Sequence, residues 1–317
     1  MLLRLALMFL LFSGCYTSDV AAEVKSILVI TWRGITQAEQ GFMHKLEELG
    51  IEADYEIFDA GRDQDRLAGF LRDNQEKLKS KDLIYTFGTT TTLTAQNIGT
   101  AGVPLVFNIV ANPVEVGIAR SLAAPSLGAT GAKVSLAPEV AFEMLEHIYP
   151  FAKIGILFDP REPNSVSEVE RLSAVAEANG KQAIRLRLSP DAKKREVQVA
   201  SLKPQLLSAD VIFVAATSSF VAHAGLIRDI LPDDIVSIGS TTVFLKEGVT
   251  LVFGTEYWER GEAVAKLAAK ILVDHAIPND LAIAEVTAAN ATLFVNRNNK
   301  AVSKLNLQNA DNPIVYK

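Results

Sequence analysis

The feature that most constrains the fold is an alternation of short apolar runs with amphipathic segments, which begins near residue 27 and occurs in two successive series. The β-branched run at residues 27–32 is typical of a strand buried on both faces, and the segment at 37–49 has the periodicity of a helix. Strands that alternate with helices at this spacing predict right-handed βαβ units and parallel sheets. The first series continues with predicted strands at residues 54–58, 82–87 and 104–110, and with predicted helices at 64–79 and from within the threonines at 89–92.

The second series has a similar order of elements. It comprises predicted helices at residues 138–149, 165–179, 195–207 and 220–231, and predicted strands at 153–158, 183–188, 211–216, 236–239 and 250–254. A long helix at 256–274 and short strands at 282–286 and 293–296 are predicted to close the chain.

Residues 120–137 separate the two series. They are rich in Ala, Gly, Ser and Pro and lack a clear strand or helix period, which predicts a crossover between two domains. We therefore expect an α/β protein with two doubly wound parallel-sheet lobes, joined by crossover strands and separated by a cleft. The N-terminal lobe is predicted to contain residues 24–132 and 255–281, and the C-terminal lobe residues 133–254 and 282–317.

The charge balance and the cysteine content exclude several classes of protein. There are 31 Lys and Arg against 37 Asp and Glu, a formal net charge of −6, with no long run of one sign. We therefore expect no nucleic-acid partner and no basic membrane-binding patch. Cys15 is the only cysteine, which excludes internal disulfides and a cysteine nucleophile in the folded body. The histidines stand at no metal-ligand spacing and the common catalytic and phosphate-binding motifs are absent, so no catalytic site, metal or cofactor is predicted.

Residues 1–22 have the features of a secretory signal. Arg4 supplies a minimal positive charge, and the apolar stretch at residues 5–12 is too short to cross a bilayer. The Val-Ala-Ala sequence at 20–22 fits cleavage by an ordinary signal peptidase. Alternatively, Leu-Phe-Ser-Gly-Cys at 11–15 resembles a bacterial lipobox, which makes Cys15 the lipidated first residue of the mature protein. Either cleavage predicts a protein of the periplasm or cell envelope, free or lipid-anchored.

Polar residues follow many of the predicted strands. In open parallel sheets, ligands bind beyond the carboxyl ends of the strands, and hydroxyls and free N–H groups there suit a carboxylate or another polar group. The candidate ligand-binding residues are Trp32, Arg33, Thr36, Thr89, Thr90, Asn112, Asn164, Ser165, Thr217, Ser218, Thr241 and Tyr257. Taken alone, each Ser, Thr or Asn is more simply explained as a helix N-cap. One N-cap needs only one hydroxyl, however, and Thr is a mediocre helix former, so capping does not explain the four threonines at 89–92. Trp32 and Tyr257 could stack on a planar ligand or fill a lobe interior, and Arg33 could pair with a carboxylate or lie solvated at the rim.

Several short motifs at these strand ends occur together in a fixed order. They are Gly41-Phe42, Pro104-Leu105-Val106-Phe107 followed by Asn112-Pro113-Val114 and Gly117, Asp159-Pro160 followed by Asn164-Ser165 and Val169-Glu170, and Tyr257 ahead of Gly261. In these motifs, over about residues 26–307, the chain resembles the substrate-binding proteins of bacterial ABC transporters that are related to tryptophan- and tyrosine-binding lipoproteins.

The resemblance implies a type I periplasmic binding fold, a two-lobed Venus flytrap that closes on a small solute and passes it to a membrane permease. It implies that Asn164, Ser165, Thr89 and Thr90 hold the carboxylate or polar head of the ligand. Relatives often carry an acidic residue in the loop matching 217–219 or 240–242, and this chain has none there, which favours a neutral or anionic aromatic solute at least as much as an amino acid. We expect a monomer. A sensor that reports to a membrane signalling partner and a secreted enzyme that uses Asp159 or Glu256 are the alternatives.

Overall fold

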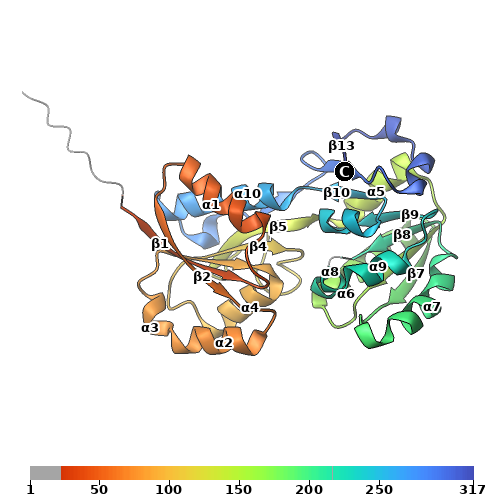
Figure 1. Cartoon of the computed structure of the whole chain (residues 1–317). Helices are drawn as coiled ribbons and strands as arrows, with labels where there is room; N and C mark the ends of the chain where they lie inside the picture. The colour runs from red at the N-terminus through yellow and green to blue at the C-terminus, as the bar shows by residue number, and fades with distance from the viewer. Residues whose placement is uncertain (1–22, 216) are drawn as a thin grey trace, which may run out of the picture.

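The computed structural model describes residues 23–215 and 217–317 and contains two α/β lobes that lie side by side (Figure 1). The first lobe has a six-stranded sheet of order β11-β5-β4-β3-β1-β2, and the second has a seven-stranded sheet of order β13-β12-β10-β9-β8-β6-β7. All pairings are parallel except that of β10 with β12, as doubly wound lobes require. The predicted fold class is confirmed. The predicted signal segment and Cys15 lie outside the described residues.

Helices cover both faces of the first sheet. Its strands are β1 (Lys25–Thr31), β2 (Ala53–Asp59), β3 (Leu83–Phe87), β4 (Leu105–Val110), β5 (Ala129–Leu136) and β11 (Ala284–Val286). Its helices are α1 (Gln37–Glu48), α2 (Gln64–Asp73), α3 (Gln75–Leu78), α4 (Gly88–Ile98), α10 (Tyr257–Leu272) and the short η3 (Pro278–Asp280). Helices α1 and α10 share one core with the sheet, and α2, α3 and α4 share another core on the opposite face.

The second lobe is layered in the same way. Its strands are β6 (Lys153–Phe158), β7 (Gln182–Arg187), β8 (Val211–Val214), β9 (Val236–Gly239), β10 (Leu251–Gly254), β12 (Thr292–Val295) and β13 (Ile314–Tyr316). Its helices are α5 (Pro138–Ile148), α6 (Pro163–Ala178), α7 (Arg195–Leu206), α8 (Ser218–Ala222), α9 (Ala224–Ile230) and the short η1 (Ala192–Lys194), η2 (Thr242–Glu247), η4 (Lys300–Lys304) and η5 (Leu307–Asn309). Helices α5 and α6 pack on one face, and α7, α8 and α9 on the other.

Strand β5 corrects the prediction that residues 120–137 lack regular structure. All eight residues of β5 are buried, yet they include two alanines and a glycine instead of a β-branched run. A Cβ added at Gly131 would lie 2.0 Å from the carbonyl oxygen of Phe107 on the neighbouring strand β4. The close approach of two backbones therefore requires a glycine here, and this requirement removes the apolar signal by which a buried strand is normally recognised.

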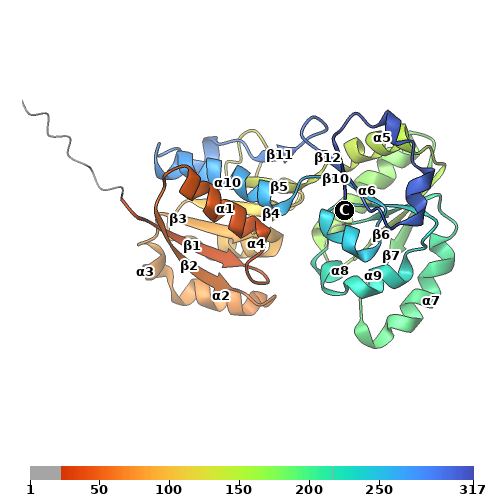
Figure 2. The ribbon, with the colours of Figure 1, turned by 45° about the horizontal axis from the view of Figure 1, so that its top comes forward.

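Two of the predicted lobe boundaries fall at or next to strands of the first sheet. The boundary between residues 132 and 133 falls inside β5, and the boundary between 281 and 282 falls just before β11. Strand β11 pairs with β5 in the first sheet, with Ala284 opposite Ala132 and Val286 opposite Leu136. Because hydrogen-bonded neighbours belong to one sheet, we place the crossings after residues 136 and 286. Figure 2 shows β5, β10 and β11 in the region between the lobes.

Two predicted helices are each interrupted once. The segment predicted at 64–79 breaks at Asn74, whose φ of −110° and ψ of 16° end α2 and whose side-chain amide donates to the carbonyl of Phe70. The segment predicted at 220–231 breaks at His223 between α8 and α9. The side chains of both residues lie within hydrogen-bond distance of a backbone carbonyl in the preceding turn and so compete with the backbone hydrogen bonds of the helix. The hydrophobic periodicity of the sequence does not reveal such breaks. Strand β13 was not predicted.

Helices α1 and α10 approach each other at two glycines, and both views show these helices together on one side of the first sheet (Figures 1 and 2). A Cβ added at Gly261 would lie 2.1 Å from the carbonyl oxygen of Ala38, and one added at Gly41 would lie 2.3 Å from that of Trp258. The contact positions Tyr257, the first residue of α10, at the edge of the first sheet that faces the second lobe.

Candidate ligand-binding site

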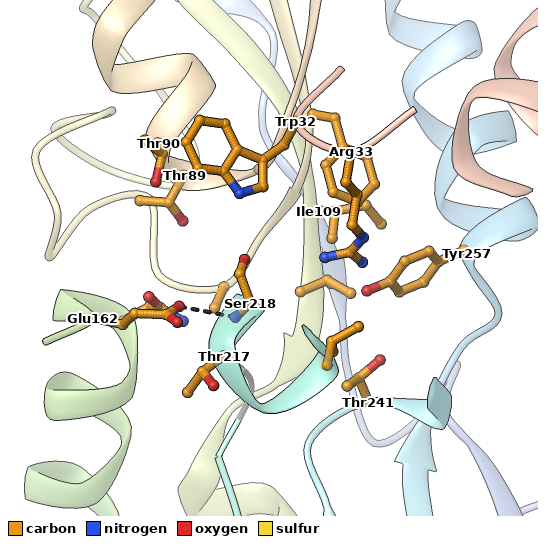
Figure 3. Close-up of a pocket in the computed structure, with 16 residues that line it drawn as sticks. Trp32, Arg33, Thr89, Thr90, Ile109, Glu162, Thr217, Ser218, Thr241 and Tyr257 are labelled. Carbon is orange, nitrogen blue, oxygen red and sulfur yellow. Dashed lines mark hydrogen bonds between the residues drawn. The ribbon is translucent and has the colours of Figure 1, made fainter. Parts of the chain in front are cut away.

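A cavity lies between the two lobes, beyond the carboxyl ends of β1, β3 and β4 in the first lobe and of β6, β8 and β9 in the second (Figure 3). The first lobe lines it with Trp32, Arg33, Phe87, Gly88, Thr89, Thr90, Ile109, Ala111, Val134 and Tyr257. The second lobe lines it with Glu162, Asn164, Thr217, Ser218, Val221 and Thr241. Most of the residues that the strand-end argument selected are therefore brought together around one cavity.

Thr36, Asn112 and Ser165 do not line this cavity. The Thr36 side chain caps α1, accepting from Ala38 N–H and donating to the Glu39 carboxylate. Ser165 is fully buried, and its hydroxyl accepts the N–H of Asp159 at 2.9 Å. Asn112 lies beside the cavity, where its amide nitrogen is 3.4 Å from the Ser167 hydroxyl on α6.

The four threonines at 89–92 divide between two roles. Thr91 and Thr92 are fully buried, and their hydroxyls donate to the carbonyl of Gly88 within α4. Thr89 and Thr90 line the cavity. The run thus combines backbone hydrogen bonds at the start of α4 with polar side chains on the cavity wall, so neither the capping explanation nor the binding explanation covers all four residues.

An aromatic and cationic wall belongs to the first lobe. The rings of Phe87 and Tyr257 meet edge to face with centroids 6.2 Å apart, and the Arg33 guanidinium lies over the Phe87 ring, 5.1 Å from its centroid. Figure 3 shows the Arg33 guanidinium, the Tyr257 hydroxyl and the Trp32 indole directed into the cavity. Among residues 23–215 and 217–317, Arg33 makes no salt bridge. The wall therefore offers a planar apolar surface and one cation without a carboxylate partner.

The second lobe presents polar groups at the start of α8. The Thr217 hydroxyl accepts the N–H of Phe220 at 2.8 Å and caps the helix. The Glu162 carboxylate accepts the N–H groups of Ser218 and Ser219 at 2.9 and 2.8 Å. On the neighbouring loop, the buried Thr241 hydroxyl has no hydrogen-bond partner in the described part of the chain. An unsatisfied buried hydroxyl in a cavity wall costs free energy, and a polar group of a ligand can remove that cost.

Asp159, which follows β6, is held behind the cavity wall. Its carboxylate accepts from the Arg161 guanidinium at 2.6 and 2.9 Å and from the Ser219 hydroxyl at 2.7 Å. Burial alone raises the pKa of Asp159, but the hydrogen bonds from Arg161 and Ser219 outweigh it and keep the pKa below its usual value. A fully buried carboxylate that is ion-paired and hydrogen-bonded in this way is unsuited to act as a general base, contrary to the enzyme alternative.

A strained residue forms part of the first-lobe wall. Ile109 has a φ of 56°, in the left-handed region that β-branched residues avoid. The Asn108 side-chain oxygen accepts the N–H of Ile109 at 2.9 Å, and its amide donates to the Tyr85 hydroxyl, which donates to the buried Glu39 carboxylate. Burial raises the pKa of both Glu39 and Tyr85. This buried network stabilises a backbone conformation that directs Ile109 into the cavity wall, and the sequence contained no signal for it.

Within the described ranges, no set of three or more His, Cys, Asp or Glu side chains is arranged to hold a metal ion. None of the helices in those ranges has the length and apolar character needed to cross a membrane.

Two α/β lobes with a cavity between them, lined from both sides by hydrogen-bonding groups, define a bilobal solute-binding protein. Comparison with family models identifies the particular family. Residues 23–316 match the model described as ABC transporter substrate binding protein, and the chain belongs to that family. It is thus the substrate-binding component of an ABC transporter, in a family of binding proteins and not of enzymes.

Individual relatives agree with this assignment. The tyrosine-binding protein of Clostridioides difficile is 24% identical over 288 residues, which cover 88% of this chain and 79% of that protein. A solved domain from Streptococcus pneumonia in complex with L-Trp has a TM-score of 0.75 and 17% identity, covering 92% of this chain and 100% of that one. A ligand-free, open substrate-binding protein from Clostridium difficile has a TM-score of 0.71 and 21% identity, covering 93% and 100%. A periplasmic binding protein type 1 from Bordetella pertussis, at TM-score 0.64, 13% identity and coverage of 88% and 98%, shares the fold.

Proposed function

We propose that the interlobe cavity binds a small solute that carries a carboxylate and a planar or aromatic group. An aromatic amino acid or a closely related acid has this chemistry. The binding residues are the candidates that line the cavity: Trp32, Arg33, Thr89, Thr90, Asn164, Thr217, Ser218, Thr241 and Tyr257. Two relatives support this class of ligand, since one is named a tyrosine-binding protein and another was solved with L-Trp.

The observation that carries the proposal is the position of Arg33. Its guanidinium points into the cavity beside three aromatic rings and has no salt-bridge partner in the described residues. A guanidinium binds a carboxylate through two parallel N–H···O bonds, and the cation–π contact with the Phe87 ring helps to hold the Arg33 guanidinium in the cavity. Trp32 and Tyr257 are then placed to contact the planar part of the same solute.

Ligand capture is proposed to proceed by lobe closure. A solute that contacts Arg33 of one lobe and the Ser218 region of the other interacts with both walls only when the lobes are close. The closed form with solute bound is the form that a membrane permease would recognise. We expect the binding protein to act as a monomer, because one chain supplies both walls of the cavity.

The proposed location is the periplasm or cell envelope. Its support is the signal-like pattern of residues 1–22, with either cleavage before residue 23 or lipidation at Cys15. Mass spectrometry of the protein purified from its native membrane fraction would distinguish a diacylated N-terminal cysteine from a free N-terminus at residue 23.

The ligand proposal is tested by a thermal-shift screen of L-Tyr, L-Trp and related acids, followed by Arg33→Met. A ligand at a hundredfold excess over its Kd stabilises the folded protein by about 2.7 kcal/mol. Arg66→Met is the matched control, because Arg66 also lies over a phenylalanine ring, that of Phe58, but does not line the cavity. We expect Arg33→Met to abolish the ligand-induced shift and Arg66→Met to preserve it. The proposal fails if no carboxylate-bearing solute binds, or if both variants bind alike.

A further inference from the structure

Glu162 is the one anionic side chain that lines the cavity within the described residues. It occupies the N-cap position of α6, but its side chain makes no capping hydrogen bond to that helix. The carboxylate instead reaches across to the N–H groups of Ser218 and Ser219. Figure 3 shows it on the wall opposite Arg33.

The charges around Glu162 do not cancel. The nearest cation, Arg161, forms a salt bridge with Asp159, and Glu162 only adds to the electrostatic field that raises the pKa of Arg161. Glu162 itself is in no salt bridge with any described residue. Asp159, Arg161 and Glu162 together carry one net negative charge, while Arg33 on the facing wall carries one positive charge. The cavity is therefore bipolar, with an unpaired charge of opposite sign on each lobe.

We propose that Glu162 is a specificity-determining residue, which makes the cavity prefer a solute with a positively charged group over the anionic analogue that lacks it. The inference rests on the proposed function, in which Arg33 takes the carboxylate end of the solute. A cationic group at the other end of the solute lies next to Glu162. The sequence did not reveal this role of Glu162, because the residue stands before α6 and not in the loops at 217–219 or 240–242, where relatives often carry their acidic residue.

The hydrogen bonds of Glu162 also restrict what else the second lobe can bind. The N–H groups of Ser218 and Ser219 could otherwise donate hydrogen bonds to an anionic ligand, but both already donate to the Glu162 carboxylate. An incoming carboxylate at that wall would have to displace Glu162 and would meet its negative charge. Each carboxylate oxygen keeps a free lone pair for an ammonium donor, because a carboxylate accepts about four hydrogen bonds.

The test uses matched pairs of probes: L-Tyr with 3-(4-hydroxyphenyl)propionate, and L-Trp with indole-3-propionate. Isothermal titration of the wild-type protein is expected to show the amino acid of a pair bound at least about 30-fold more tightly than its des-amino partner. In Glu162→Gln, the amino acid should lose most of that advantage while the des-amino acid binds as well as before or better. Glu170→Gln, which neutralises an exposed glutamate on the same helix, should leave the preference unchanged.

The outcomes separate the two proposals. If the wild-type protein binds the des-amino acids as tightly as the amino acids, the role of Glu162 is refuted and the carboxylate-binding function stands. An equal loss for both members of a pair in Glu162→Gln means that Glu162 only supports α8, which also refutes the inference. If no probe binds the wild-type protein, the proposed function fails and the inference with it. Should Glu162→Gln not fold, Glu162→Asp is expected to retain the preference, and the wild-type preference alone can still refute the idea.

Discussion

Arg171 joins the two lobes without touching the cavity. From α6 in the second lobe, its guanidinium lies 2.8 Å from the Glu115 carboxylate, in the loop that follows β4 of the first lobe. The same guanidinium also contacts Glu139, at the start of α5 in its own lobe, at 2.7 Å. Of the two salt bridges, only the one with Glu115 crosses between lobes, alongside a longer hydrogen bond of 3.4 Å from the same guanidinium to the Asn112 side-chain oxygen, so its removal should shift the equilibrium toward the open form.

The size of the effect follows from exposure. The side chains of Arg171 and Glu115 are 30% and 37% exposed, so the pair is screened by water and contributes about 0.5–1 kcal/mol at low salt. If this free energy is present only with the lobes together, Glu115→Gln reduces the closed-to-open ratio about two- to fivefold. Where the open form predominates before binding, the apparent Kd rises by the same factor, since binding requires the closed form.

The assay compares Glu115→Gln with Glu139→Gln by stopped-flow fluorescence and titration. Glu139→Gln removes an ion pair from the same guanidinium but leaves the crossing between lobes intact, so it is the matched control. We expect Glu115→Gln to weaken binding and speed ligand release, with the difference from wild type diminishing at high salt. Equal effects of the two variants, or tighter binding by Glu115→Gln, would show that the Arg171–Glu115 pair does not favour closure.

Three further predictions concern the cavity wall and the folded state. Asn164→Ala and Thr90→Ala should each raise the Kd of a bound solute while circular dichroism still shows a folded protein, and an unaltered Kd would remove that residue from the site. Gly261→Ala should lower the free energy of unfolding, measured in urea, by about 1–3 kcal/mol, because the added Cβ would lie 2.1 Å from the Ala38 carbonyl oxygen. The control Gly69→Ala, whose Cβ would have no atom within 4 Å, should not lower the free energy of unfolding. Asp159→Asn should lower the stability of the fold at neutral pH. The pKa of Asp159 in the folded protein is below the ordinary 3.8, so its contribution to stability is fully present above pH 3.8 and is lost as the pH falls through the lower folded value. Thermal melts from pH 7 to pH 2 should therefore show the melting temperatures of the variant and the wild type converging in acid.

The fold was predictable where strands are buried between layers of helices. Continuous β-branched runs such as the one around Val29 favour strands buried on both faces, and their alternation with amphipathic segments favours the parallel topology. Strand β5 was missed for the opposite reason, since the contact of Gly131 with the Phe107 carbonyl favours a small residue over an apolar one. The pairing of β5 with β11 joins segments about 150 residues apart, and no local pattern records it, so the predicted lobe boundaries could not take it into account.

The candidate site was predictable as a set of positions but not as a set of roles. Strand ends converge in any open parallel sheet, so listing the residues there found Arg33 and Thr90 without knowledge of the structure. The same list included Ser165, whose hydroxyl is used by the neighbouring backbone. The list omitted Glu162, because a glutamate directly before Pro163 is typical of the solvent-exposed start of a helix. Only the folded position of α8 brings the Ser218 N–H to its carboxylate.

The separation of the two charges also explains how a solute can control closure. In an open form, Arg33 and Glu162 are each solvated on their own lobe, and closing the lobes removes water from both. Without a ligand this desolvation is compensated only in part, by the two backbone N–H groups at Glu162 and by the Phe87 ring at Arg33, because the two charges form no salt bridge with each other in the described structure. A solute with a carboxylate at one end and a cation at the other compensates both charges at once, whereas a solute with one charge compensates only one. The free energy of closure then depends on the charge pattern of the solute. The Arg171–Glu115 pair adds a contribution to this free energy that favours closure and does not depend on the solute.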